Sequence, residues 1–330
     1  MWMDEAAITP LEAAPPTGIS DVASAYIDSI ITLLSANSIV RHELDWEALR
    51  LNARAQASHA VSTADTYAAV RQMIYALGVR HTFLIPAGGQ DVGPLMSSPG
   101  LVRHSPADFA PRIDPGRTGY VAIPALAAED SALQVQYATV LQSALASLAH
   151  HSPCGWIIDL RENTGGNMWP MLADLGPLLG DGVAGKFVGE DTVTWGYWSG
   201  QAKQGKYALT TVPQPVGILP HRPVAVLVSE RTASSGEAIL LALRSRADAR
   251  TFGSASAGLA SANATYALPD GSWIAITTSL TADRLGNTYL GPVPPDVSVP
   301  SSADGSADPV VAAASEWLLS MTACKTPSPN

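Results

Sequence analysis

The chain has 330 residues, of which 47% are hydrophobic and 15% charged, which predicts a globular protein with one large domain or two to three small ones. The 29 acidic residues outnumber the 19 basic ones and give a net charge of −10, so the basic footprint of a nucleic-acid-binding protein is missing. Apolar runs stay below the roughly 18 residues that span a bilayer, which predicts a soluble rather than a transmembrane protein.

The N-terminal part of the chain predicts a loose segment followed by helices. Residues 1–18 are rich in proline and alanine and lack the apolar core of a secretory signal. Residues 19–85 predict a helical domain, because apolar side chains recur there at helical spacing. Gly78 is placed to end the last of these helices, and His81 follows directly after it.

The rest of the chain alternates between strand and helix patterns. Residues 86–118 hold many prolines and glycines and predict a loop or cover. Residues 119–300 predict an α/β core, in which apolar strands such as VAVLV alternate with amphipathic helices. This alternation is typical of a largely parallel sheet. Residues 301–330 predict a C-terminal tail, and the two cysteines are too few for a disulfide scaffold.

Two strand-to-helix turns, RENTGGN and SERTASSGE, carry the residues that could do chemistry. In open α/β sheets, sites form at the carboxyl ends of strands, where such turns lie. A serine at the start of a helix lies near backbone amides that favour a developing oxyanion. The two turns together therefore indicate a serine nucleophile with an oxyanion hole. Taken singly, a serine-rich turn is more often a helix cap, and a Gly-Gly pair more often a tight turn.

Further segments accompany these turns in a fixed order: GWIIDLRENTGG, VAVLVSERTASSGEAILLAL, FGSASAG, LPDGS and GPVPPDV. In this order they resemble the serine peptidases of the C-terminal processing, or tail-specific, protease family. That family includes the tricorn protease core and the repeats of interphotoreceptor retinoid-binding protein. The resemblance implies a crotonase-like βαβ core with an N-terminal helical bundle, a peptide or protein substrate, and no metal or organic cofactor. It also implies a periplasmic or secreted location.

Carried over residue by residue, the resemblance implies a nucleophile at Ser234. Ser235 is the competing candidate for that role, because it stands next to Ser234 in TASSGE. The amide of Ser235 and that of Gly165 or Gly166 would then form the oxyanion hole.

The general base departs from the better-known branch of the family. Tail-specific proteases use a lysine that would fall on position 259, where this chain has Leu259, and no lysine occurs between Lys206 and Lys325. The tricorn branch uses a histidine from the helical region, and His81 matches that context. An unperturbed imidazole titrates near neutrality and suits a general base. The other histidines lack this context and are expected at the surface: His42, His59, His104, His150, His151 and His221.

The remaining matched residues are expected to orient the base or to brace the glycine turn. The tricorn branch has a glutamate before the GPVPPDV segment, and none stands there in this chain. Asp283 is the nearest carboxylate and our candidate third catalytic residue, with a loop aspartate paired to Arg284 as the alternative. Asp159, Arg161 and Asn163 match the DLRxN segment and are expected to brace the turn that presents the glycines.

The sequence thus predicts a serine peptidase that acts through a Ser/His acyl-enzyme. The stretch between His81 and Tyr120 is too short for the PDZ module of tail-specific proteases, so none is expected. One alternative is a non-catalytic protein that binds apolar ligands, with Trp195, Tyr197 and Trp198 as a lining. Another is an esterase that acts on non-peptide substrates.

Overall fold

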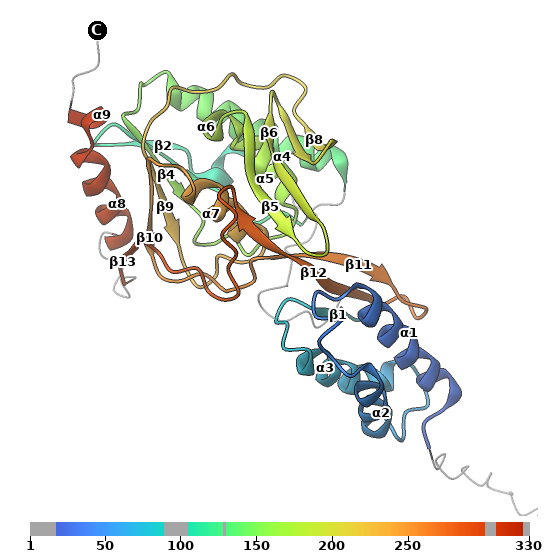
Figure 1. Cartoon of the computed structure of the whole chain (residues 1–330). Coiled ribbons are helices and arrows are strands. Elements are labelled where there is room, and N and C mark those ends of the chain that lie inside the picture. The colour runs from blue at the N-terminus through green and yellow to red at the C-terminus, as the bar shows by residue number, and fades with distance from the viewer. Residues whose placement is uncertain (1–17, 89–104, 128–129, 301–307, 326–330) are drawn as a thin grey trace, which may run out of the picture. The chain divides into compact units, whose positions relative to one another are not determined.

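The computed structural model describes residues 18–88, 105–127, 130–300 and 308–325. The chain divides into two compact units (Figure 1). The N-terminal unit comprises residues 1–90 and 265–276, and the main unit comprises residues 91–264 and 277–330. The mixed α/β class predicted from the sequence is confirmed.

The N-terminal unit is built on the helices α1 (Asp21–Asn37), α2 (Trp46–Gln56) and α3 (Tyr67–Ala76), with a 3-10 turn, η1 (Ala64–Thr66), before the last. Ile27, Ile30 and Leu34 of α1 are fully buried in its core. Strand β1 (Phe83–Ile85) pairs antiparallel with residues 273–275 of β12 (Trp273–Asp283). Gly78 follows the end of α3 with a positive φ of 71°, the left-handed conformation expected of a glycine at this position.

A six-stranded sheet forms the centre of the main unit. Its order is β13 (Val297–Ser298), β10 (Ala249–Gly253), β9 (Val224–Val228), β4 (Gly155–Asp159), β3 (Thr118–Ala122) and β2 (Arg112–Asp114). All neighbouring pairs are parallel except β2 with β3. The largely parallel core sheet predicted from the sequence is therefore confirmed.

Helices cover both faces of this sheet (Figure 1). Alternate strand residues face opposite layers. Val224, Val226 and Val228 join one core with α4 (Ser131–Ala149) and α7 (Ser235–Arg244), whereas Ala225 and Leu227 join another with α8 (Pro309–Ser320). Burial on both faces explains why the sequence of β9 is an unbroken apolar run.

A second, antiparallel sheet completes the main unit. Strands β5 (Gly182–Val188), β6 (Thr192–Trp198), β7 (Gln201–Gln204) and β8 (Tyr207–Thr211) pair in sequence, and residues 280–283 of β12 pair with β5. Strand β11 (Ser261–Ala267) also pairs with β12. The short helices are η2 (Pro106–Phe109), α5 (Met168–Asp174), α6 (Gly176–Leu179) and α9 (Thr322–Lys325). Trp195 and Tyr197 are buried, so ordinary packing accounts for both rings.

The C-terminal residues differ from the predicted tail. Within 301–330, the described residues 308–325 form α8 and α9. Val310, Ala314 and Leu318 pack against the parallel sheet, and a disulfide joins Cys324 to Cys154. The alanine-rich sequence of α8 gives a weak amphipathic signal, and the pairing of two cysteines 170 residues apart depends on the fold. Among the described helices, none is long and apolar enough to cross a membrane.

Candidate active site

The two turns predicted to carry chemistry lie side by side in the main unit. RENTGGN follows β4 and SERTASSGE follows β9, and these strands are parallel neighbours, so their carboxyl ends meet at one edge of the sheet. The amide of Ala233 donates to the Asn163 carbonyl oxygen at 3.0 Å. The hydroxyl of Ser235 donates to the Gly166 carbonyl oxygen at 2.5 Å. Direct hydrogen bonds therefore fix the two turns to each other.

Ser234 has the most unusual backbone of this region. It is the N-cap of α7, with φ 52° and ψ −115°. A non-glycine residue in such a sparsely populated region costs on the order of 1–3 kcal/mol, and strain of this kind is concentrated at functional sites. The Ser234 amide donates to Glu237 Oε2 at 2.9 Å. Unlike its buried neighbours, Ser234 is partly exposed.

Ser235, the competing candidate, has a different environment. Its side chain is 9% exposed, and its hydroxyl proton is used in the bond to the Gly166 carbonyl. A nucleophile must give its proton to a base and reach the substrate. These contacts therefore favour Ser234 over Ser235 for the nucleophilic role.

Two glycines bring the first turn against Ser234. Gly165 and Gly166 have φ values of 104° and 107°, which side chains rarely allow. A Cβ on Gly165 would lie 2.9 Å from Ser234 Cβ and 3.3 Å from Ser235 N, and one on Gly166 would lie 2.0 Å from the Leu126 carbonyl oxygen. Both positions therefore need glycine. The Gly165 amide donates to Asn163 Oδ1 at 2.9 Å, so that proton is already engaged.

Asn163 braces the glycine turn, as the sequence predicts. It is fully buried. Its Oδ1 accepts from Gly165 N, and its Nδ2 donates to the Ile123 carbonyl oxygen at 3.0 Å. A Cβ on Gly236, in the first turn of α7, would lie 2.6 Å from the Asn163 carbonyl oxygen. The side chain thus joins the glycine turn to the end of β3, close against α7.

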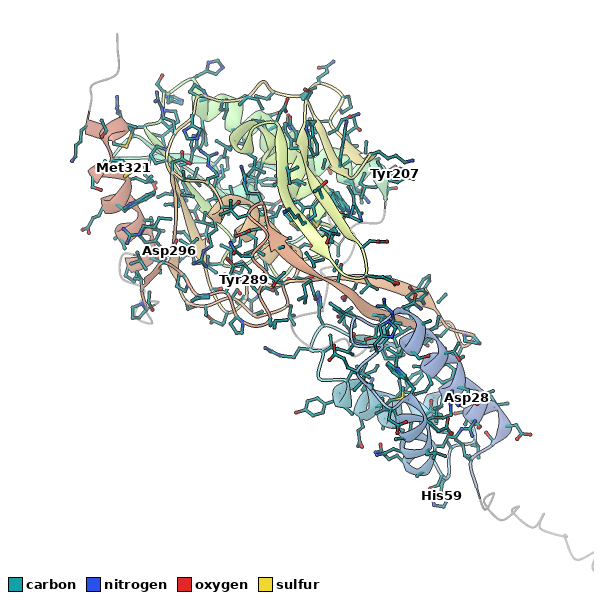
Figure 2. All side chains as sticks on the ribbon, in the orientation of Figure 1. Asp28, His59, Tyr207, Tyr289, Asp296 and Met321 are labelled. Carbon is teal, nitrogen blue, oxygen red and sulfur yellow. A yellow bond between two sulfur atoms is a disulfide. The ribbon has the colours of Figure 1, made fainter. Side chains whose placement is uncertain are left out.

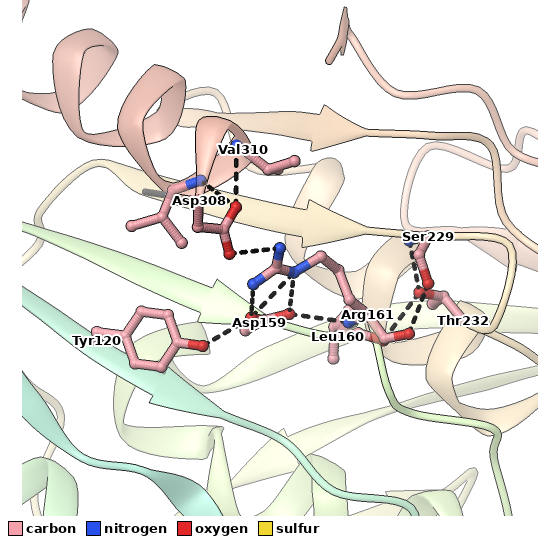
Figure 3. A network of polar contacts seen from close by, with 9 residues as sticks. Tyr120, Asp159, Leu160, Arg161, Ser229, Thr232, Asp308 and Val310 are labelled. Atoms are coloured by element: carbon pink, nitrogen blue, oxygen red, sulfur yellow. Dashed lines mark hydrogen bonds and ion pairs between the residues drawn. The ribbon is translucent and has the colours of Figure 1, made fainter. Parts of the chain in front are cut away.

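Asp159 and Arg161 brace a wider region than predicted (Figure 3). Arg161 Nη2 lies 2.6 Å from Asp159 Oδ2, and Arg161 Nη1 lies 2.7 Å from Asp308 Oδ2 at the N-cap of α8. The hydroxyl of Tyr120 donates to Asp159 Oδ2 at 2.6 Å, and burial, together with the Asp159 charge, raises the pKa of Tyr120 to about 12. The Ser229 hydroxyl donates to the Arg161 carbonyl oxygen. This network connects the SERTASSGE turn to the C-terminal helix.

Position 259 has an environment suited to an apolar side chain. Leu259 is 6% exposed and packs with Ala233 and Ala257. Its amide donates to Glu237 Oε2 at 2.7 Å. The sequence pattern gives Glu237 no predicted role beyond its place at the start of a helix. The spacing of Ser234 and Glu237 is that of a capping box, and this spacing could have identified Glu237 as a partner of the Ser234 amide.

His81 lies in the N-terminal unit, between α3 and β1. It is 5% exposed, and its ring stacks on Phe83 with the centroids 6.2 Å apart. The exposed histidines expected from the sequence are confirmed at His42, His59 (labelled in Figure 2), His150, His151 and His221. His104 falls outside the described residues. Over the described part of the chain, no group of three or more His, Cys, Asp or Glu side chains could hold a metal ion.

Asp283 is engaged by its own turn. It ends β12, is 5% exposed, and accepts through Oδ1 from the amides of Gly286 at 2.8 Å and Asn287 at 3.0 Å. Its Oδ2 accepts from Asn287 Nδ2 at 2.9 Å. Arg284 donates to Ser245 Oγ at 2.9 Å. The carboxylate therefore holds the turn that leads towards the GPVPPDV segment.

Residues 117–299 match peptidase family S41. The chain belongs to this family. A nisin-resistance protein of Lactococcus lactis subsp. lactis is 29% identical over 278 residues, which are 84% of this chain and 80% of that protein. The match confirms the predicted resemblance and makes the chain a member of a family of serine peptidases.

Solved structures share the fold. A lipoprotein from Streptococcus agalactiae superposes with a TM-score of 0.68 at 21% identity, over 94% of this chain and 99% of that one. The photosystem II D1 C-terminal processing protease superposes with a TM-score of 0.55 at 16% identity, over 85% of this chain and 94% of that one. At these identities the likeness shows a shared fold.

Proposed function

We propose that this S41 peptidase cleaves peptide bonds through an acyl-enzyme on Ser234. The observation that carries the proposal is the strained backbone of Ser234 at the N-terminus of α7, directly against Gly165. Such a turn projects a hydroxyl at the end of a strand and places it among helix amides. The engaged hydroxyl of Ser235 supports this choice of serine.

In the proposed mechanism, Ser234 Oγ attacks the carbonyl carbon of the substrate and transfers its proton to the imidazole of His81. The amides of Gly166 and Ser235 hold the oxyanion, because the Gly165 amide is occupied by Asn163. His81 then protonates the leaving amine, and water hydrolyses the ester. The proposed nucleophile belongs to the main unit and the proposed base to the N-terminal unit.

Asp283 is the proposed orienting carboxylate for His81. Asp283 already accepts three hydrogen bonds from the following turn, so we expect its contribution to orienting His81 to be small. Asp283→Asn is therefore expected to reduce kcat/KM less than His81→Ala does. An equal loss in a stable protein would give Asp283 a larger part in the mechanism than we propose.

For the architecture, we propose a crotonase-like βαβ core preceded by the helical domain 19–85. The parallel succession of β3, α4 and β4 supports the core, and helices α1 to α3 support the helical domain. We also propose a location outside the cytoplasm. The disulfide between Cys154 and Cys324 favours an oxidising compartment, and a similar structure is described as a lipoprotein.

A fluorophosphonate probe tests the nucleophile, because it phosphonylates activated serines. Wild type is expected to label at Ser234, Ser235→Ala to label as well, and Ser234→Ala to remain unlabelled. Digestion of a peptide library by wild type, beside Ser234→Ala, then tests peptide-bond cleavage. A wild-type protein that is not labelled would favour the binding alternative. The structure gives that alternative little support, because the rings of Trp195 and Tyr197 are buried and cannot line an exposed pocket. Turnover of esters alone would favour an esterase.

A further inference from the structure

Glu237 is a buried carboxylate one turn into α7 that the proposed mechanism does not use. Its side chain is fully inaccessible to solvent. Four donors converge on it: Ser234 N at 2.9 Å and Leu259 N at 2.7 Å on Oε2, and Ser256 Oγ at 2.6 Å and Gly258 N at 2.8 Å on Oε1. Burying a carboxylate is expensive, and a structure retains one only when its partners offset the cost.

The carboxylate contacts two segments of the chain directly and is linked to a third. It accepts from Ser234 in the SERTASSGE turn, from Ser256 and Gly258 in the FGSASAG segment, and from Leu259 directly after that segment. The hydroxyl of Ser256 accepts in turn from Val293 N at 2.8 Å, in the GPVPPDV segment. Two of the motifs that carry the family resemblance therefore meet at this side chain, and Ser256 links it to a third.

Hydrogen bonds rather than an opposite charge hold Glu237 in place. In the part of the chain that the structure describes, no ion pair involves it. Burial raises its pKa, and its hydrogen bonds oppose that rise. The resemblance to tail-specific proteases would place a lysine at position 259. In this chain, residue 259 contacts Glu237 through its backbone amide.

We propose that Glu237 is the positioning residue of the nucleophile, an inference that rests on the role proposed for Ser234. Its Oε2 accepts from the Ser234 amide and the Leu259 amide together. The Ser234 amide is thereby tied to a second, rigid segment while the residue holds φ 52° and ψ −115°. The carboxylate fixes the serine backbone in this conformation, and the backbone sets the direction of Oγ.

The test compares variants by the second-order rate of fluorophosphonate labelling of Ser234. Glu237→Ala removes all four acceptor contacts, and Glu237→Asp keeps the charge but withdraws the carboxylate by one methylene. Because a displacement of about 1 Å can cost about 10²-fold in rate, labelling is expected to fall by about 10- to 100-fold in both. With a peptide substrate, kcat falls and KM stays near its wild-type value, because the nucleophile moves and the substrate contacts do not.

Glu230→Gln is the matched control. Glu230 is an exposed glutamate of the same turn, and it accepts from Ser254 Oγ rather than from Ser234. Its labelling rate is expected to equal that of wild type. Unfolding in urea shows that each variant is native under the assay conditions, and Glu237→Asp decides the question if Glu237→Ala does not fold.

The possible failures are distinguishable. Wild type that does not label at Ser234 overturns the proposed function itself. Wild type that labels, together with a folded Glu237→Ala or Glu237→Asp that labels at the same rate, overturns only the positioning role. A loss of stability without a change in the labelling rate of the folded protein overturns the positioning role as well.

Discussion

Gly165→Ala isolates the contact between the glycine turn and the nucleophile. The new Cβ would lie 2.9 Å from Ser234 Cβ, whereas non-bonded carbon atoms are in optimal contact at about 3.5–4.0 Å. Relief of the contact therefore needs a shift of about 0.6–1.1 Å. A displacement of this size at a reacting group can cost about 10²-fold in rate, so kcat/KM is expected to fall by about that factor.

Gly180→Ala provides the matched control for this experiment. Gly180 also has a positive φ, 78°, but a Cβ there would have no neighbour within 4 Å. Both substitutions place an alanine at a sparsely populated positive φ, at a cost on the order of 1–3 kcal/mol that urea unfolding measures. Only Gly165→Ala touches Ser234. A folded Gly165→Ala protein with wild-type kcat/KM, or a Gly180→Ala protein that is equally impaired, would refute the reasoning.

Four further substitutions, at three positions, give the remaining predictions. Ser234→Ala and Ser234→Gly should both lower kcat by about 10⁴-fold or more. In urea unfolding, the glycine variant should be more stable than the alanine variant by about 1–3 kcal/mol, because glycine relieves the strained backbone. Equal stabilities of the two variants would argue against strain. His81→Ala should be nearly as damaging as Ser234→Ala when kcat/KM is compared; near-normal activity of the variant would remove His81 as the base. Asp174 is fully buried, neither of its side-chain oxygens accepts a hydrogen bond of good geometry, and burial raises its pKa well above the usual value against a smaller lowering by the Leu175 amide. The folded state therefore retains its proton, so this group costs stability as pH rises above about 3.9, by up to about 1.4 kcal/mol per pH unit. Asp174→Asn should be more stable than wild type at pH 7, with a difference that shrinks towards pH 4, and a difference independent of pH would contradict this.

The parts of the fold that the sequence predicts are those with a strong local pattern. The buried run Val224–Val228 predicts a strand and forms β9 over the same residues. Asp270 and Gly271 predict a hairpin turn and connect β11 to β12. In both cases, burial and turn chemistry leave a mark on consecutive residues.

The contacts around Glu237 could not be predicted in this way. Three of its four partners donate through backbone amides, those of Ser234, Gly258 and Leu259. A backbone donor is available at every residue except proline, so its use leaves no trace in the side-chain pattern. The contact of Asp308 with Arg161 could not be predicted for a related reason. It depends on α8, whose sequence gives only a weak amphipathic signal and follows a segment rich in serine and aspartate.

A lysine introduced at position 259 is expected not to act as a base, because the environment of Leu259 suits an apolar side chain. The side chain is 6% exposed beside Ala233 and Ala257, and the residue's own amide is bonded to Glu237. In Leu259→Lys, the ammonium would lose hydration, and Glu237, which accepts from the amide of residue 259, would offer a counter-charge. A pair between the two would draw the carboxylate away from the Ser234 amide. The double variant His81→Ala/Leu259→Lys is therefore expected to be no more active than His81→Ala, measured as kcat/KM from about pH 6 to 10. Recovery of activity with an alkaline rising limb would show that the site still accepts a lysine base.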